Sequence, residues 1–336
     1  MGQKMNLVII ATGMIAAFAV TGGFTPLLIK AATQAGLLEH DDNKRGRPLV
    51  PGMGGFAIMA GIIAAILVGV LISTYAIIDL QAQNILLASL ATVALVGIVG
   101  ILDDLFKIRL FFKTMLPVLG SLPLVAIQAG ESILKIPILG FINFGVGYHF
   151  ILVPIGVTGA ANATNLTAGY NGLEAGFGAI AFSSLLIIAI HKGSFPAAFL
   201  LAAGLGACLA FLKFNWFPAS IFPGDVGTLS IGALLAAAVI IGNMEIYGII
   251  LLMPAFYELG ATVYYSIKGV ARRKAVHSPH ITADGRLRPP AGSEYYNLPH
   301  FILSRKSLRE PQLVLVYLSL FALSGTLALA AYALGI

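Results

Sequence analysis

Long apolar stretches separated by short polar loops run along the whole chain. A helix needs about 20 apolar residues to cross the hydrocarbon core of a bilayer, and ten stretches approach or exceed that length. The ten predicted spans cover residues 6–29, 52–75, 84–102, 113–129, 148–163, 174–190, 196–213, 226–243, 247–267 and 312–334. The pattern predicts an all-α polytopic membrane protein, and we expect residues 1–336 to form a single integral-membrane domain.

The composition supports this fold class. Of the 336 residues, 58% are hydrophobic and only 10% are charged, whereas a soluble domain is typically about 25% charged. The first apolar run, from Leu7 to Ile29, is too long for the core of a cleavable signal peptide and lacks a clear cleavage site. The single cysteine, Cys208, lies in an apolar span and is expected to be a small buried hydrophobe.

Basic residues mark one side of the predicted bundle. Seventeen of the 20 Lys and Arg residues lie in loops that follow odd-numbered spans. The exceptions are Lys4, Lys135 and Lys192. Because loops rich in Lys and Arg stay in the cytoplasm, we expect the odd-to-even loops to be cytoplasmic and both termini to lie outside. This topology explains the net charge of +6, so no nucleic-acid partner is expected.

On the outer side, residues 131–150 alternate apolar and small residues around Gly140 and Gly145. This alternation predicts a short external hairpin.

Five polar clusters lie on the predicted cytoplasmic face, which favours one shared active site there. They are residues 41–45, 103–104, 162–174, 222–225 and 277–280. A transporter is expected instead to carry polar groups near the middle of the membrane, on broken helices. Glu258, inside the ninth span, is the main residue of that kind. Its other reading is an acid paired with Tyr264 or with a backbone group.

Two adjacent acids, Asp103 and Asp104, end an apolar run that has no charged residue from Leu80 to Leu102. Paired carboxylates at a membrane face favour metal-assisted chemistry on a phosphate. The alternative is a solvated helix end, where aspartate often acts as a cap. Lys113 opens the next span and can reach back to neutralise a pyrophosphate oxygen, or it can extend its ammonium to the membrane interface.

Magnesium prefers hard oxygen ligands, with water and phosphate completing its octahedron. The carboxylate of Asp225 and the amide oxygen of Asn165 are the candidate ligands. Asp225 also precedes a predicted helix, so it is placed to cap that helix, and the two roles can coexist. Asn171 lies six residues after Asn165 across a predicted sharp turn, where amides either read a base edge or cap the turn itself.

Two further segments can approach a ligand. The glycine-rich stretch 52–55 leaves its backbone free to approach a ligand or a neighbouring helix, and it matches no phosphate-binding loop of the Walker type. His277 and His280 lie in a basic loop with Arg272, which favours a phosphate or sugar clamp. Zinc is less suited to that loop, because no cysteine or third ligand is close in sequence.

Three segments in this order and spacing resemble the polyprenyl-phosphate N-acetylhexosamine-1-phosphate transferase family, glycosyltransferase family 4. They read GILDDL at 100–105, NATNLTAGYNGLE at 162–174 and FPGD at 222–225. The resemblance covers nearly the whole chain, includes the ten spans, and extends to bacterial, archaeal and eukaryotic branches of the family. Residues 168–169 read Ala-Gly and residues 171–174 read NGLE, as in the dolichyl-phosphate branch. The stretch 52–55 looks bacterial, and such a mixed pattern is typical of an archaeal enzyme.

The resemblance implies roles for individual residues. Asp103 matches the first catalytic acid, Asp104 its neighbour, and Lys113 a lysine on the diphosphate. Asn165 and Asp225 match the magnesium ligands. Residues matching the substrate-binding set are Asn162, Asn171, Phe222, Arg272, His277 and His280, with Asn171 and Phe222 around the uracil and the His277 loop at the sugar phosphate.

The expected reaction is transfer of N-acetylglucosamine-1-phosphate, or a related HexNAc-1-phosphate, from a UDP-sugar to a polyprenyl or dolichyl phosphate. UMP is released, and Mg²⁺ is the expected cofactor, with Mn²⁺ as a substitute. The near rival is a bacterial-type transferase that uses undecaprenyl phosphate. The rival of another class is a membrane transporter or lipid flippase. The sequence leaves open the sugar, the lipid length, the role of Asp103 as base or positioning group, and whether the chain forms a homodimer.

Overall fold

Long helices make up most of the protein. The computed structural model describes residues 2–77, 79–137, 139–269, 279–289 and 297–336. Its helices are α1 (Gly2–Ala35), α2 (Gly55–Ile72), α3 (Leu80–Phe106), α4 (Leu110–Met115), α5 (Pro117–Ala126), α6 (Val153–Thr167), α7 (Leu173–Lys192), α8 (Phe195–Asn215), α9 (Gly224–Ile241), α10 (Glu245–Ile267), α12 (Leu298–Arg305) and α13 (Glu310–Ala333). Short π-helical turns cover Ser73–Ile77 and Tyr148–Leu152.

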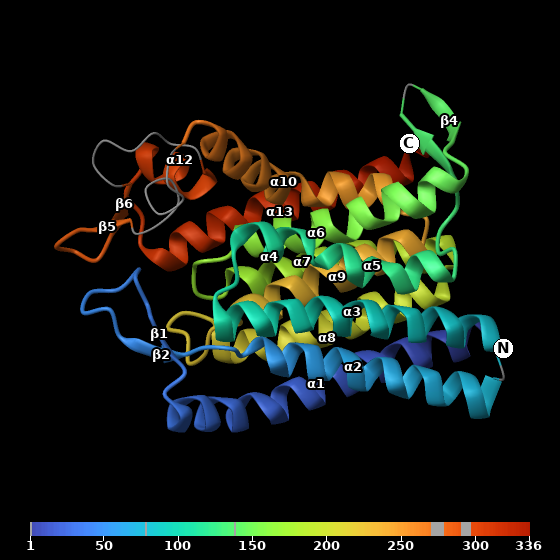
Figure 1. Ribbon diagram of the computed structural model, residues 1–336, viewed down its shortest axis with the longest axis horizontal. Helices are drawn as coiled ribbons and strands as arrows, with labels where there is room; N and C mark the ends of the chain where they lie inside the picture. The colour runs from blue at the N-terminus through green and yellow to red at the C-terminus, as the bar shows by residue number, and fades with distance from the viewer. Residues whose placement is uncertain (1, 78, 138, 270–278, 290–296) are drawn as a thin grey trace.

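In the described residues, three antiparallel hairpins lie at the ends of the helices. They pair β1 (Leu38–His40) with β2 (Leu49–Pro51), β3 (Ile133–Ile136) with β4 (Gly140–Asn143), and β5 (His280–Ile281) with β6 (Leu287–Arg288). Figure 1 shows the first and third hairpins with α12 at one end of the bundle, and β4 with both chain termini at the other. The hairpin predicted within 131–150 is confirmed.

Nine helices in the described part of the chain are long and apolar enough to cross a membrane. The predicted polytopic all-α fold is therefore confirmed, although the fourth expected span, 113–129, has a different form. It is a pair of short helices, α4 and α5, that together cover Leu110–Ala126. Pro117 begins α5 and Pro123 lies inside it, and proline lacks the N–H that a continuous helix needs. The segment expected to form the fourth span is thus shorter than the nine long helices and is broken.

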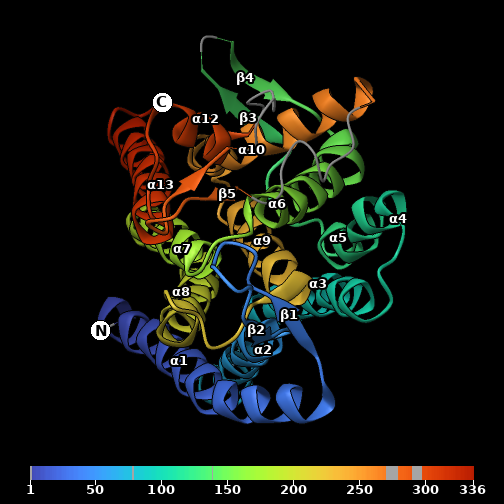
Figure 2. The same cartoon turned by 90° about the vertical axis from the view of Figure 1, so that its left-hand side faces the viewer.

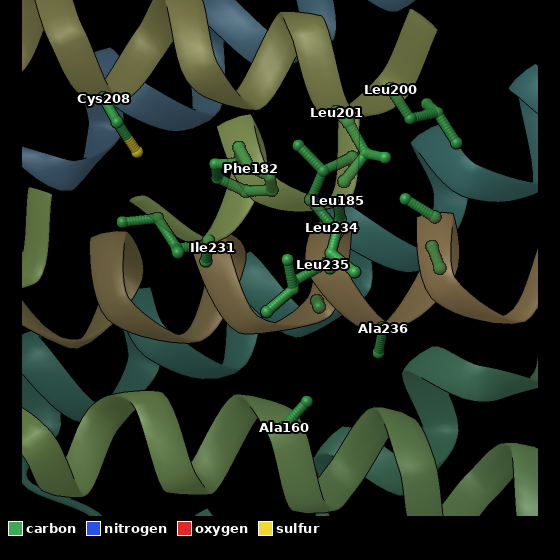
Figure 3. Packing of buried hydrophobic residues seen from close by; sticks show 14 of the residues in the cluster. Ala160, Phe182, Leu185, Leu200, Leu201, Cys208, Ile231, Leu234, Leu235 and Ala236 are labelled. Atoms are coloured by element: carbon green, nitrogen blue, oxygen red, sulfur yellow. The ribbon is translucent and has the colours of Figure 1, made fainter. Parts of the chain in front are cut away.

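Helix α9 lies at the centre of the bundle, in contact with α2, α3, α6, α7, α8 and α10 (Figure 2). Eighty-three per cent of its span is buried inside the protein. Figure 3 shows Leu234 of α9 beside Leu185 of α7 and Leu201 of α8. Cys208 is buried in the same core, as predicted. The central position of α9 fixes where its first turn, and therefore Asp225, is held.

Two glycines allow neighbouring helices to touch the first turn of α9. A Cβ atom on Gly55 of α2 would lie 2.0 Å from the backbone nitrogen of Gly227, and one on Gly100 of α3 would lie 2.5 Å from the Cα of Val226. Small residues permit such backbone contact between helices in a membrane. The 52–55 stretch therefore approaches a neighbouring helix, one of the two outcomes predicted for it.

Candidate active site

A cavity of about 330 Å³ opens at the end of the bundle that carries the β1–β2 hairpin. Its walls come from the β1–β2 segment, α4, the end of α6 with the following loop, the start of α9, and α10 and α13. The predicted site residues that line it are Lys113, Asn165, Asn171, Phe222 and Asp225. Asp41 and Pro279 line it as well, so residues from four of the five polar clusters surround this cavity.

An ammonium held by two carboxylates forms the centre of this site. Lys113 Nζ lies 3.0 Å from Asp103 Oδ2 and also pairs with Asp225 Oδ2. Asn165 Nδ2 donates to Asp225 Oδ1 at 2.5 Å and to Thr228 Oγ1 at 2.8 Å. Lys113 and Asp103 are only 8% and 7% exposed, so little water screens these charges and their interaction is strong.

Helix ends, rather than loops, position these side chains. The sequence predicted that a loop begins at Asp103. The structure instead places Asp103 in the last turn of α3, because this helix continues to Phe106. Lys107 then adopts a left-handed conformation, with φ of 49°, and its N–H donates to Asp103 O at 2.9 Å. Asn165 similarly lies inside α6 rather than after it. The backbone at both positions is therefore rigid.

A second cavity, of about 390 Å³, adjoins the first between α4, α6 and α10. Its apolar wall is formed by Leu110, Leu166, Leu259, Val263 and Ile267. Lys113 and Asn165 line both cavities. Asn162 lines only the second, where its Nδ2 donates to Thr114 O at 3.0 Å and to Thr158 O at 2.8 Å. Asn162 therefore ties α6 to α4 beside the apolar cavity.

Comparison with known proteins agrees with this arrangement. Residues 85–243 match the family model described as glycosyl transferase family 4. A protein of Saccharolobus solfataricus, provisionally named UDP-N-acetylglucosamine–dolichyl-phosphate N-acetylglucosaminephosphotransferase, is 31% identical over 326 residues, which cover 96% of this chain and 97% of that protein. The chain belongs to glycosyl transferase family 4. The family assignment from the three sequence segments is thereby confirmed.

Two further relatives show how far the similarity extends. A Sulfolobus acidocaldarius protein of the same provisional name is 31% identical over 314 residues, covering 93% of both chains. A phospho-N-acetylmuramoyl-pentapeptide-transferase of Shouchella clausii is 35% identical over 213 residues, covering 60% of this chain and 63% of that enzyme. The archaeal, dolichyl-type relatives thus match this family 4 protein over more of its length, as the sequence predicts.

Asp104 has a different environment from its neighbour in this family 4 protein. Its carboxylate accepts the backbone N–H groups of Asp225 at 2.9 Å and Val226 at 3.2 Å. Carboxylates stabilise the first turn of a helix by accepting its unpaired N–H groups and by opposing its dipole. Asp104 therefore holds the start of α9, which carries Asp225, while Asp103 faces Lys113.

Replacing Asp104 with Ala is expected to lower the free energy of unfolding by about 1–3 kcal/mol, because two buried N–H groups lose a charged acceptor. Thermal unfolding of the purified variant in detergent measures the change. The control is Asp284→Ala, since Asp284 forms an exposed pair with Arg286 and its side chain is 59% exposed. Equal melting temperatures for the two variants would contradict the capping role.

Both ends of the Asn171 amide are hydrogen-bonded to the protein. Its Oδ1 accepts from Lys44 Nζ and from the backbone N–H of Ala219, both at 2.7 Å. Its Nδ2 donates to Asp41 Oδ2 at 3.1 Å. Asn171 lines the cavity, but in this state it joins the β1–β2 segment to the segment before α9. Lys44 and Asp41 were missed as its partners because about 130 residues separate them from it in sequence.

Four predicted substrate-binding residues remain, and the structure describes two of them, Phe222 and His280. Phe222 lines the cavity, and its backbone oxygen accepts from Gly54 N at 2.7 Å. His280 begins β5 with an exposed side chain, and only its neighbour Pro279 lines the cavity. Arg272 and His277 lie outside the described residues.

Several cavity residues were missed or left open by the sequence analysis. Glu258 Oε1 accepts from the backbone N–H of Leu298 and from the Tyr317 hydroxyl, both at 2.9 Å, so the expected backbone partner is confirmed. Glu39, in β1, also lines the cavity. A single acid such as Glu39 belongs to no sequence motif that would have placed it at the cavity.

The carboxylate ligand that Asp225 offers fits a magnesium ion. No cluster of three or more His, Cys, Asp and Glu side chains that could hold a metal occurs among the described residues. Magnesium, however, is commonly held by one or two carboxylates and completed by water and substrate phosphates. Asp225 and Asn165 both line the polar cavity. In this structure Asn165 turns its amide nitrogen toward Asp225 Oδ1, at 2.5 Å, so the Asp225 carboxylate is the hard oxygen ligand available where a phosphate can enter.

Proposed function

We propose that this protein transfers N-acetylglucosamine-1-phosphate, or a related HexNAc-1-phosphate, from a UDP-sugar to a dolichyl-type polyprenyl phosphate. The observation that supports this most is that Lys113 and Asn165 line both a polar and an apolar cavity. A nucleotide sugar suits the first cavity and a lipid chain the second. Their phosphates then meet at one buried ammonium.

In this reaction an oxygen of the lipid phosphate forms a bond to the β-phosphorus of the UDP-sugar. The bond from that phosphorus to the bridging oxygen breaks, and UMP leaves with the electron pair. Because the second pKa of a phosphate monoester is about 6, the attacking oxygen is largely deprotonated at neutral pH. We therefore assign Asp103 to positioning Lys113, its partner at 3.0 Å, rather than to removing a proton.

Neutralising charge on the diphosphate is the main task of the site in this proposal. The ammonium of Lys113 would contact phosphate oxygens as a point charge. Asp225 and Asn165 would hold a magnesium ion, which supplies further charge neutralisation, and manganese accepts the same oxygen ligands. The site residues proposed for the reaction itself are thus Asp103, Lys113, Asn165 and Asp225.

We also propose that the site faces the cytoplasm and that both termini lie outside. Seventeen of 20 basic residues are in loops on the predicted cytoplasmic side. In Figure 1 the two chain termini lie at the opposite end of the bundle from the β1–β2 hairpin that borders the cavity. One transferase unit over residues 1–336 is consistent with this arrangement.

The purified protein is expected to release UMP from UDP-N-acetylglucosamine in the presence of dolichyl phosphate and magnesium. A chelator should stop the release, and either magnesium or manganese should restore it. Formation of a lipid-linked sugar diphosphate, detected by mass spectrometry, distinguishes transfer from hydrolysis. No UMP from any UDP-HexNAc, with dolichyl or undecaprenyl phosphate, would contradict the proposal and favour a transporter or flippase.

The bacterial-type alternative is tested in the same assay. Bacterial transferases match 60% to 72% of this chain, against 93% and 96% for the two dolichyl-type relatives, which favours the dolichyl-type acceptor. A strong preference for undecaprenyl phosphate would reverse that choice while leaving the transferase reaction itself supported.

A further inference from the structure

Two buried glutamates hold the loop between α6 and α7. Glu174 Oε1 accepts the backbone N–H of Gly169, and Glu310 Oε1 accepts that of Asn171, both at 2.8 Å. Glu174 is 6% exposed and Glu310 is 3% exposed. In each of them the second oxygen, Oε2, is buried and has no hydrogen-bond partner. A buried carboxylate oxygen without a partner is unfavourable, so each of these oxygens requires an explanation.

The surroundings of the two free oxygens differ. Glu310 Oε2 lies 3.7 Å from the Lys44 ammonium, which offsets its charge. Within the described ranges no ion pair involves Glu174, and Glu174 is among the residues that line the polar cavity. Glu310 does not line that cavity. Glu174 therefore combines a buried oxygen that has no partner with a position on the cavity wall, where a bound molecule can supply the missing partner.

The chemistry of a carboxylate limits what this partner can be. A carboxylate accepts hydrogen bonds and repels phosphate oxygens. In a nucleotide sugar the diphosphate offers no donor, whereas the uridine and the sugar carry hydroxyl and N–H groups. The diphosphate is already provided for at Lys113, whose ammonium is paired with Asp225. The neutral parts of the substrate are thus left for the wall that contains Glu174.

We propose that Glu174 Oε2 accepts a hydrogen bond from one hydroxyl or N–H group of the uridine or of the sugar in the UDP-sugar donor. This inference rests on the proposed function. Glu174 also holds Gly169, whose carbonyl accepts from Asn43 Nδ2 at 2.7 Å. The Glu174 carboxylate thus binds one group of the substrate and also holds the loop against the β1–β2 segment. It therefore contributes to specificity for the UDP-sugar.

The test uses donor analogues that each lack one hydrogen-bond donor. On the uridine these are the N3-methyl and the 2′-deoxy analogues, and on the sugar they are analogues with fluorine in place of one hydroxyl. The wild-type protein is expected to lose about 100-fold in kcat/KM with one analogue, because a carboxylate oxygen is then left buried and unpaired. The position of the missing donor in that analogue shows whether Glu174 binds the uridine or the sugar.

Glu174→Gln is expected to raise KM for the normal donor by about tenfold or more, since its amide N–H would face the substrate donor. In this variant the sensitive analogue and the normal donor should be used almost equally. Glu310→Gln is the matched control, because Glu310 is an equally buried acid of α13 that bonds the same loop but does not line the cavity. It should keep the full wild-type discrimination among analogues.

Three results would overturn the inference. They are wild-type protein that uses every analogue equally well, a Glu174→Gln variant that keeps the wild-type discrimination, and a Glu310→Gln variant that loses it to the same extent. If the Glu174→Gln variant fails to fold, equal use of every analogue by the wild-type protein still overturns the inference. Absence of UMP release from the normal donor would instead reject the proposed function itself.

Discussion

Asp225→Asn is expected to lower UMP release by about a thousandfold while leaving the fold intact. The Asp225 carboxylate accepts from both Lys113 and Asn165 and is the proposed magnesium ligand with a charge. Asparagine keeps the size of the side chain but removes that charge, which electrostatic catalysis by the site requires. The first turn of α9 should survive, because Asp104 rather than Asp225 accepts its N–H groups.

Two measurements separate loss of metal from loss of structure in this variant. UMP release is titrated with magnesium, and thermal unfolding is followed in the same detergent. The half-saturating magnesium concentration should rise in Asp225→Asn, and it should stay at the wild-type value in the exposed control Asp284→Asn. Activity within about tenfold of wild type at unchanged magnesium dependence would remove Asp225 from the site.

The apolar pattern predicted the helices well because every membrane-spanning segment is under the same physical constraint. Backbone polar groups in lipid must be satisfied within the helix, so about 20 apolar residues mark each span. The ends were less predictable. Helix α3 continues through Asp103 and Asp104 to Phe106, because acids near a membrane surface are tolerated within a helix as well as after it. Pro117 and Pro123 show where the pattern fails, since residues 113–129 look like one span and are not one continuous helix.

The site was predictable only to the level of which segments meet. Polar loops on one face of a helical membrane protein lie close together, which was enough to group Lys113, Asn165 and Asp225. It was not enough to separate Asp103 from Asp104, since adjacent residues on a helix point in different directions. Nor could the sequence show that the Asn171 amide is already bonded to Lys44 and Asp41. Such pairings depend on tertiary packing over long separations in the chain.

Lys113→Met should abolish activity and also destabilise the protein. One buried ammonium pairs with both Asp103 and Asp225, so its removal leaves two carboxylates close together without a counter-charge. Breaking a buried ion pair by removing one partner costs about 3–5 kcal/mol. Methionine fills a similar volume, so the loss of stability should report charge rather than a cavity.

The double variant Lys113→Met with Asp103→Asn separates the two effects. Removing one of the two unpaired carboxylates should restore a large part of the lost stability, because the remaining repulsion is then relieved. It should not restore UMP release, since the ammonium proposed to bind the diphosphate is still missing. Thermal unfolding in detergent and the UMP assay are measured on Lys113→Met, on Asp103→Asn and on the double variant. Together they give the coupling free energy between Lys113 and Asp103. If stability were not recovered, the two carboxylates would not share Lys113 as their counter-charge. If activity returned with it, Lys113 would act only in folding, and the proposed contact between its ammonium and the diphosphate would be wrong.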